Sequence, residues 1–192
     1  MSNDFNGKIS RKYVIDNVVM TFEGLNMTSR QMDELFRDSF LDLPVLYKVP
    51  INEDESSFIV VSMHNLITFG IDEDELREAA KRNTFSKTVV IDLKNGIAAS
   101  MCEGISGAVI MTSKDSMRNL SERFYCGGGF YIIPSSIYEI ITAPVREDTD
   151  DERSNLLEIL KEGNKTLVEK EEILSYSLYR YYSDDEEVKI EC

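Results

Sequence analysis

The stretch GGGFYIIPSSIYEIIT, residues 127–142, sets the predicted end of a helix directly beside two predicted strands. The triple glycine follows a segment of helical periodicity that starts at Ser113, so it predicts the end of that helix. Residues 130–133 and 137–142 are rich in β-branched and aromatic side chains, which favours two strands around Pro134-Ser135-Ser136. A helix and neighbouring strands therefore alternate within this short part of the chain.

The segments on either side continue this mixture. Further strands are predicted at residues 13–22, 43–49, 58–62, 87–93, 105–112, 175–182 and 187–191. Further helices are predicted to start at Thr28, Asp72 and Thr149. Some strands alternate with helices and others pair as hairpins, which does not fit a strict βαβ array. We therefore expect the α+β class: one mixed, largely antiparallel sheet with about three to four helices packed on it. The expected domain spans residues 13–192 after a flexible tail of residues 1–12.

The helix expected at residues 72–82 has the clearest local signal. Asp72 is its N-cap, Glu75 is the capping-box partner, and Ile71 can pack on Leu76. The acidic first turn complements the positive end of the helix, so we interpret it as a well-started helix rather than a metal site. An EF-hand loop would need alternating ligands, a central glycine and a closing glutamate, which this turn lacks.

Composition excludes several classes of protein. The chain has 192 residues, of which 42% are hydrophobic, as in an ordinary globular domain. It holds 35 acidic and 21 basic residues, which gives a formal net charge of −14. A general nucleic-acid binder needs Lys and Arg to neutralise phosphates, and an anionic membrane repels an acidic protein. We therefore expect neither nucleic acid nor a membrane as a direct partner.

The acidic charge is concentrated near the C-terminus. Residues 146–192 hold 15 acidic and 7 basic residues. This region is interpreted either as an interface for a basic partner or as a solvated face that keeps the protein soluble. Tyrosines in the same region favour sheet packing or a protein interface. The candidate interaction residues are Tyr179, Tyr182, Asp184, Asp185, Glu186 and Glu187.

Targeting signals and cysteine usage favour the cytoplasm. The N-terminus has no basic region followed by an apolar stretch, so it does not read as a signal peptide. No stretch approaches the roughly 18–20 apolar residues of a membrane span. Cys102, Cys126 and Cys192 are widely spaced and form no CxxC, which is typical of a reducing compartment.

Motifs for catalysis, cofactors and metals are weak. His64 is the only histidine and no GxSxG motif accompanies it, so we interpret it as a surface or capping residue. A zinc site with several histidines is excluded. The glycines at 127–129 follow a helix and precede a strand, which is the wrong order for a phosphate loop. We expect no cofactor and no metal.

One catalytic hypothesis remains. Ser135 and Ser136 are possible nucleophiles, although hydroxyls in such a turn usually bond local backbone groups. Glu139 lies on the strand face of Ile137 and Ile141, and its pKa would be perturbed if that face is buried. With His64, these side chains would have to converge on one pocket to form a site.

Several segments resemble one bacterial family, catalogued as domain of unknown function 5688. They are LDLPVLYKV (41–49), HNLITFGIDEDELREAAKRNT (64–84), ISGAVIM (105–111), GFYIIPSSIYEII (129–141) and EILSYSLYRYY (172–182). The resemblance covers roughly residues 14 to 190 and implies a bacterial, cytoplasmic α+β protein. It implies no activity. Members tend to carry a histidine where this chain has Tyr138, and they usually have an additional N-terminal region.

Together these observations favour a non-enzymatic, acidic module that binds a protein with a basic surface. One alternative is a nucleic-acid mimic, encoded by a phage or mobile element, that inhibits a host nuclease or defence protein. A second is a hydrolase-like enzyme with a site near Ser135, Ser136 and Glu139. A third is a toxin-immunity or regulatory protein that docks a partner through residues 150–190.

Overall fold

The computed structural model describes residues 9–25, 33–51, 57–92, 98–101 and 106–192, and it confirms the α+β class. The helices are α1 (Arg11–Asn17), α3 (Met63–Phe69), α4 (Glu73–Phe85), α5 (Lys114–Tyr125) and α6 (Asp150–Thr166), with a 3-10 helix η2 (Gly107–Thr112). The strands are β1 (Val19–Phe22), β2 (Arg37–Phe40), β3 (Leu43–Pro50), β4 (Phe58–Val60), β5 (Val89–Asp92), β6 (Ala98–Met101), β7 (Phe130–Ile133), β8 (Glu139–Pro144), β9 (Tyr179–Tyr182) and β10 (Glu187–Ile190).

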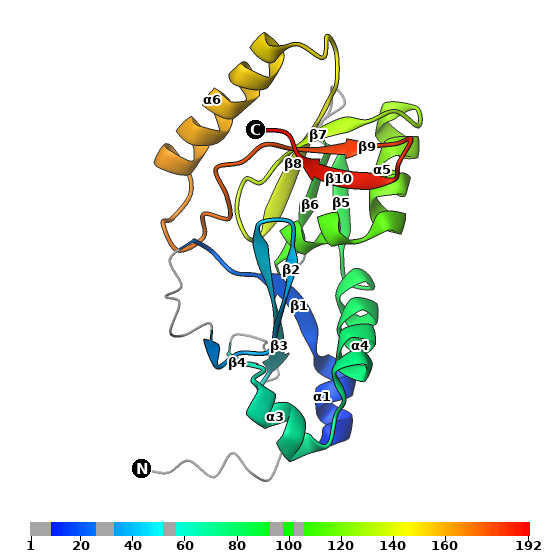
Figure 1. Ribbon diagram of the computed structural model, residues 1–192, viewed down its shortest axis with the longest axis vertical. Helices are drawn as coiled ribbons and strands as arrows, with labels where there is room; N and C mark the ends of the chain where they lie inside the picture. The colour runs from blue at the N-terminus through cyan, green and yellow to red at the C-terminus, as the bar shows by residue number, and fades with distance from the viewer. Residues whose placement is uncertain (1–8, 26–32, 52–56, 93–97, 102–105) are drawn as a thin grey trace.

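The expectation of a single mixed sheet is wrong, because the described strands form two sheets and pair only in antiparallel fashion. The first sheet has the order β1-β3-β2, with β4 also paired to β3. The second has the order β10-β9-β7-β8-β6-β5. The two sheets follow one another along the long axis of the molecule (Figure 1). The chain passes from the first to the second through α4, and the alternation of elements in the sequence does not reveal this break.

Helices cover both faces of the second sheet. Alternate side chains of a strand point to opposite faces, so Tyr131 and Ile133 pack with Leu160 of α6. Phe130 and Ile132 belong instead to the main core, which also holds residues of α5 and η2. This arrangement places the start of α6 beside the end of β8, where the acidic surface described below is formed.

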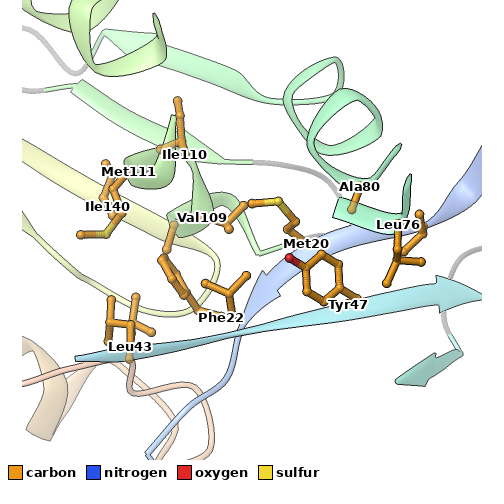
Figure 2. Packing of buried hydrophobic residues seen from close by; sticks show 14 of the residues in the cluster. Met20, Phe22, Leu43, Tyr47, Leu76, Ala80, Val109, Ile110, Met111 and Ile140 are labelled. Atoms are coloured by element: carbon orange, nitrogen blue, oxygen red, sulfur yellow. The ribbon is translucent and has the colours of Figure 1, made fainter. Parts of the chain in front are cut away.

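One apolar core joins the two sheets. Figure 2 shows Met20 of β1, Tyr47 of β3, Val109 of η2 and Ile140 of β8 within one cluster of buried residues. Two side-chain hydroxyl groups accept hydrogen bonds from backbone N–H groups on the outer edge of β1. The Met20 N–H donates to Thr84 Oγ1 at 2.8 Å, and the Phe22 N–H donates to Ser106 Oγ at 3.2 Å. An edge strand exposed in this way would otherwise leave buried donors unpaired.

Several local predictions are confirmed. Asp72 Oδ1 accepts from the Glu75 N–H at 2.8 Å and begins α4, although the helix continues to Phe85. Ser113 caps α5, and this helix ends at Cys126 and Gly127, both with positive φ. The hairpins β3–β4 and β9–β10 also form as expected.

Other local predictions are wrong. Residues 11–17 are helical, so the expected strand over 13–22 is shortened to β1 and the tail does not extend to residue 12. Ser10 Oγ caps this helix by accepting from the Tyr13 N–H, a signal hidden by the β-branched residues that follow. Residues 107–112 form η2 rather than a strand. Of the helix expected from Thr28, residues up to 32 lie outside the described parts, and Leu35 makes an isolated bridge to Ser62.

Among the described residues, no helix is long and apolar enough to cross a membrane.

Candidate functional site

The segment Pro134-Ser135-Ser136 is held by local hydrogen bonds. Ser135 Oγ donates to Glu139 Oε1 at 3.0 Å, and Ser136 Oγ accepts from the Tyr138 N–H at 3.1 Å. The Ser136 N–H donates to the Glu139 carbonyl at 3.2 Å, and only 6% of Ser136 is exposed. These contacts tie the turn to the start of β8, which is the structural role that the sequence favours for such hydroxyls.

His64 lies elsewhere. It is an exposed residue of α3, and its Nε2 lies 3.4 Å from Thr68 Oγ1 on the same helix. In Figure 1, α3 occupies the lower end of the molecule, whereas β8 lies in the upper half. The structure thus brings Ser135 and Glu139 together and leaves His64 apart from them. Ser135 has no basic partner among the described contacts, so the arrangement does not resemble a nucleophile activated by a base.

Tyr179 is a buried residue, which corrects its assignment to an interaction surface. None of its surface is exposed, and its hydroxyl donates to Asp42 Oδ1 at 2.8 Å. Burial raises the pKa of Tyr179, and the Asp42 carboxylate raises it further. The residue faces the core because alternate positions of β9 point inward. Tyr182 points the other way, and its hydroxyl donates to Glu191 Oε2 at 2.8 Å.

Neighbouring cations compensate most of the acidic residues in the β9–β10 turn. Asp185 lies 2.6 Å from Lys189 Nζ, and Glu187 lies 3.8 Å from the same nitrogen. Glu186 pairs with Arg118 of α5 at 2.5 Å, and this hydrogen bond holds the pKa of Glu186 below its ordinary value. Asp184 is the exposed exception, with no ion pair among the residues that the structure describes. The predicted interaction residues are therefore placed at the surface only in part.

An ion-pair network fixes the start of α6 to the second sheet. Asp148 accepts from Arg153 Nη1 at 2.8 Å and from Arg180 Nη1 at 2.7 Å. The hydrogen bond from Arg180 lowers the pKa of Asp148. Glu191 approaches the same two guanidinium groups at 3.5 and 3.8 Å. The network joins the loop before α6, the helix, β9 and the C-terminal residues, so the segment over 146–153 is held in one position.

A cavity of about 360 Å³ opens beside this anchored segment. Ala143, Pro144 and Leu156 give it an apolar wall, whereas Glu147 and Asp151 are exposed acids at its rim. Neither acid forms an ion pair within the described parts of the chain. The remaining lining residues are Arg146, Glu152 and Asn155.

Backbone hydrogen bonds hold Glu152 in this cavity. Its carboxylate accepts from the N–H groups of Arg146, Glu147 and Asp148 at 3.0 to 3.2 Å. Burial raises the pKa of Glu152, but these three bonds outweigh burial and leave the pKa below its ordinary value. The helix start predicted at Thr149 is confirmed, because the Thr149 hydroxyl accepts from the Glu152 N–H, whereas the Glu152 side chain reaches back beyond Thr149 to the preceding loop. Glu152 is therefore negatively charged at neutral pH.

The exposed face of α6 continues the acidic surface. Asp151, Glu158 and Glu162 are exposed and follow at the spacing of one helical face. Ile159 of the same helix is 60% exposed, and Leu167, the C-cap of α6, is 86% exposed, so exposed apolar side chains accompany these acids. We call this face, together with the cavity, the α6 surface. The acidic composition indicated residues 146–192 as a whole. In the sequence, only the helical spacing of positions 151, 158 and 162 distinguishes the acids on this face from those of the β9–β10 hairpin.

Among the described residues, no group of three or more His, Cys, Asp or Glu side chains is arranged to hold a metal ion.

Residues 97–183 match the family of unknown function DUF5688. The expected resemblance is confirmed over this part of the chain. No curated protein and no solved structure matches.

The DUF5688 match spans most of the second sheet. It runs from the start of β6 through β7, β8 and α6 to the end of β9. The α6 surface lies wholly inside the matched segment, whereas β10 and the first sheet lie outside it. The function of the DUF5688 family is unknown, so the match assigns no activity to these residues.

Proposed function

We propose that this protein is a non-catalytic binding protein that recognises a partner protein through the α6 surface. The partner presents a Lys or Arg side chain, flanked by apolar residues, to the cavity between β8 and α6. A cytoplasmic location and a bacterial source belong to the same proposal. The first rests on the sequence signals above, and the second on the resemblance to DUF5688.

The observation that carries this proposal is a pair of acids that form no ion pair among the described residues, at the rim of a partly apolar cavity lined by three acids and one cation, Arg146. Glu147 and Asp151 flank a pocket of about 360 Å³ whose wall includes Pro144 and Leu156. A Lys or Arg side chain has an apolar stem and a cationic head, and therefore matches both parts of this lining. Ile159 and Leu167 add exposed apolar side chains further along α6 and at its C-cap. Basic partners would also be attracted by the net charge of −14.

The α6 surface is favoured over the β9–β10 turn for a physical reason. An acid already paired with a cation must lose that partner before it binds another, so it adds little to affinity. Asp185, Glu186 and Glu187 are in this situation. Glu147, Asp151, Glu158 and Glu162 of the α6 surface form no ion pair among the described residues.

Binding of a defined basic peptide tests the proposal. We would titrate a short peptide of alternating arginine and leucine by isothermal calorimetry, beside the same peptide with glutamate in place of arginine. The arginine peptide is expected to bind, and its affinity should fall as salt rises from about 50 to 500 mM. Glu147→Gln and Asp151→Asn should each weaken binding about threefold to tenfold.

Asp184→Asn is the matched control, since it removes the same charge from an exposed acid of the hairpin. Equal losses for Asp184→Asn and Asp151→Asn would mean that only net charge matters, and would contradict a specific pocket. A pull-down from the native host at low and high salt would then identify the natural partner. If that partner is a nuclease or another nucleic-acid-binding protein, the nucleic-acid-mimic form of the proposal is supported.

A further inference from the structure

A cleft of about 650 Å³ lies where the first sheet meets the second half of the molecule. Met20, Val45 and Tyr47 form part of its base on β1 and β3. The other walls come from β2, the C-terminal half of α4, and the segment from the end of η2 into α5. Figure 1 shows the upper end of α4 facing the lower end of α5 in this region. The cleft is of the size that small organic ligands occupy.

One face of α4 lines the cleft. Glu78, Lys81, Arg82 and Phe85 follow at the spacing that places side chains on one side of a helix. Phe85 and Phe40 of β2 are half-buried aromatic residues in the lining. The lining of the cleft therefore combines half-buried aromatic rings with charged side chains.

The acids that line the cleft are already compensated. Asp38 accepts three hydrogen bonds from Arg77, at 2.9, 3.1 and 3.3 Å, and a further one from the Tyr47 hydroxyl. Lys81 pairs with Glu78 at 3.0 Å. Asp115 pairs with Arg118 at 3.2 Å, although it remains exposed.

Two basic residues that line the cleft have no ion-pair partner among the described residues. Arg82 and Lys114 line the cleft from α4 and α5, and neither forms an ion pair within the described residues. Lys114 lies near Glu186, but that carboxylate is already held by Arg118 at 2.5 Å. Lys114 occupies the first position of α5, where a positive charge is unfavourable for the helix itself. Its charge thus does not serve helix stability, and it stands out in a protein with a net charge of −14.

We propose that this cleft binds an aromatic phosphate monoester. The dianion would lie between Arg82 and Lys114, and the aromatic moiety would pack against Phe40 and Phe85. A phosphate monoester carries nearly two negative charges at neutral pH, which matches the two uncompensated cations. A guanidinium group is suited to phosphate because its donors can engage two oxygens at once. This inference is independent of the α6 surface.

Calorimetric titration in phosphate-free buffer tests it, with phenyl phosphate and AMP as ligands. Phenol and adenosine serve as their uncharged counterparts, and inorganic phosphate as the anion without an aromatic group. Each phosphorylated ligand is expected to bind at least about tenfold more tightly than its uncharged counterpart and than inorganic phosphate. Arg82→Gln and Lys114→Gln should each weaken binding about tenfold.

Lys165→Gln on α6 removes the same charge from an exposed residue outside the cleft, and should leave binding unchanged. The substituted side chains are exposed, and circular dichroism would verify that each variant is folded. Absence of binding by both phenyl phosphate and AMP would overturn the inference. Equal binding by the Arg82→Gln, Lys114→Gln and wild-type proteins would also overturn it, as would equal affinity for inorganic phosphate and both esters.

Discussion

Thr84→Val tests how the two halves of the molecule are held together. Thr84 is the last buried residue of α4 and is fully buried, and its Oγ1 accepts from the N–H of Met20 at 2.8 Å. Valine has nearly the same shape, so the substitution removes the acceptor and leaves the packing almost unchanged. The Met20 N–H points away from β3 and would then be buried without a partner.

The expected loss follows from the cost of one buried unsatisfied donor. That cost is about 1–3 kcal/mol in the free energy of unfolding. For a chain of this length, each 1 kcal/mol lowers Tm by about 2–4 °C. The variant should therefore melt about 2–12 °C below the wild type, as measured by circular dichroism or calorimetry.

Thr166→Val is the matched control. Its hydroxyl also bonds a backbone group, because it donates to the Glu162 carbonyl at 2.7 Å, but Thr166 lies at an exposed helix end. The change in stability there should stay within about 0.5 kcal/mol. If the loss of stability from Thr84→Val were as small as that from Thr166→Val, the Thr84 hydroxyl would not be the group that satisfies the Met20 N–H at the edge of β1.

Three further predictions follow from single contacts. Gly24→Ala should lower stability by about 1–3 kcal/mol, because a Cβ there would overlap the carbonyl oxygen of Glu171; an unchanged denaturant midpoint would contradict this close approach. Gly163→Ala should raise stability by up to about 1 kcal/mol, because Gly163 lies inside α6 and an added Cβ would meet no other atom; a lower Tm would argue against this position. Acid should destabilise the protein, because hydrogen bonds from Arg180 and Arg118 hold the folded-state pKa values of Asp148 and Glu186 below their ordinary values of 3.8 and 4.5. Their stabilising contribution is present above those ordinary values and is lost as pH falls through the folded-state pKa values, so Tm measured against pH should decline below about pH 4.5 and not at neutral pH.

The sequence correctly predicts helix ends that depend only on residues within one turn of each other. The Asp72 cap of α4 and the glycine-rich end of α5 both use residues within a few positions of each other, so local chemistry decides them. Residues 107–112 show the opposite case. They are apolar and β-branched, but they are buried between the two sheets, where tertiary packing favours η2 over a strand.

The candidate sites depend on contacts between distant parts of the chain. Acidic composition identified residues 146–192, but not that Arg118 would pair with Glu186 or that Asp185 would pair with Lys189. Which acids lack a counterion is a property of the folded chain, and it transferred the proposed interface from the hairpin to α6. The cleft with Arg82 and Lys114 has no sequence signal, because its walls come from segments separated by more than half the domain.

The proposed interface is tested most directly by mapping where a basic ligand contacts the protein. Backbone amide shifts would be recorded by nuclear magnetic resonance while the arginine-leucine peptide is added at low salt. Shifts are expected only in the segment around Ala143 to Leu156 and on the outer face of α6, and high salt should reverse all of them. Shifts centred on Asp184 to Glu187, or spread evenly over every acidic segment, would contradict it.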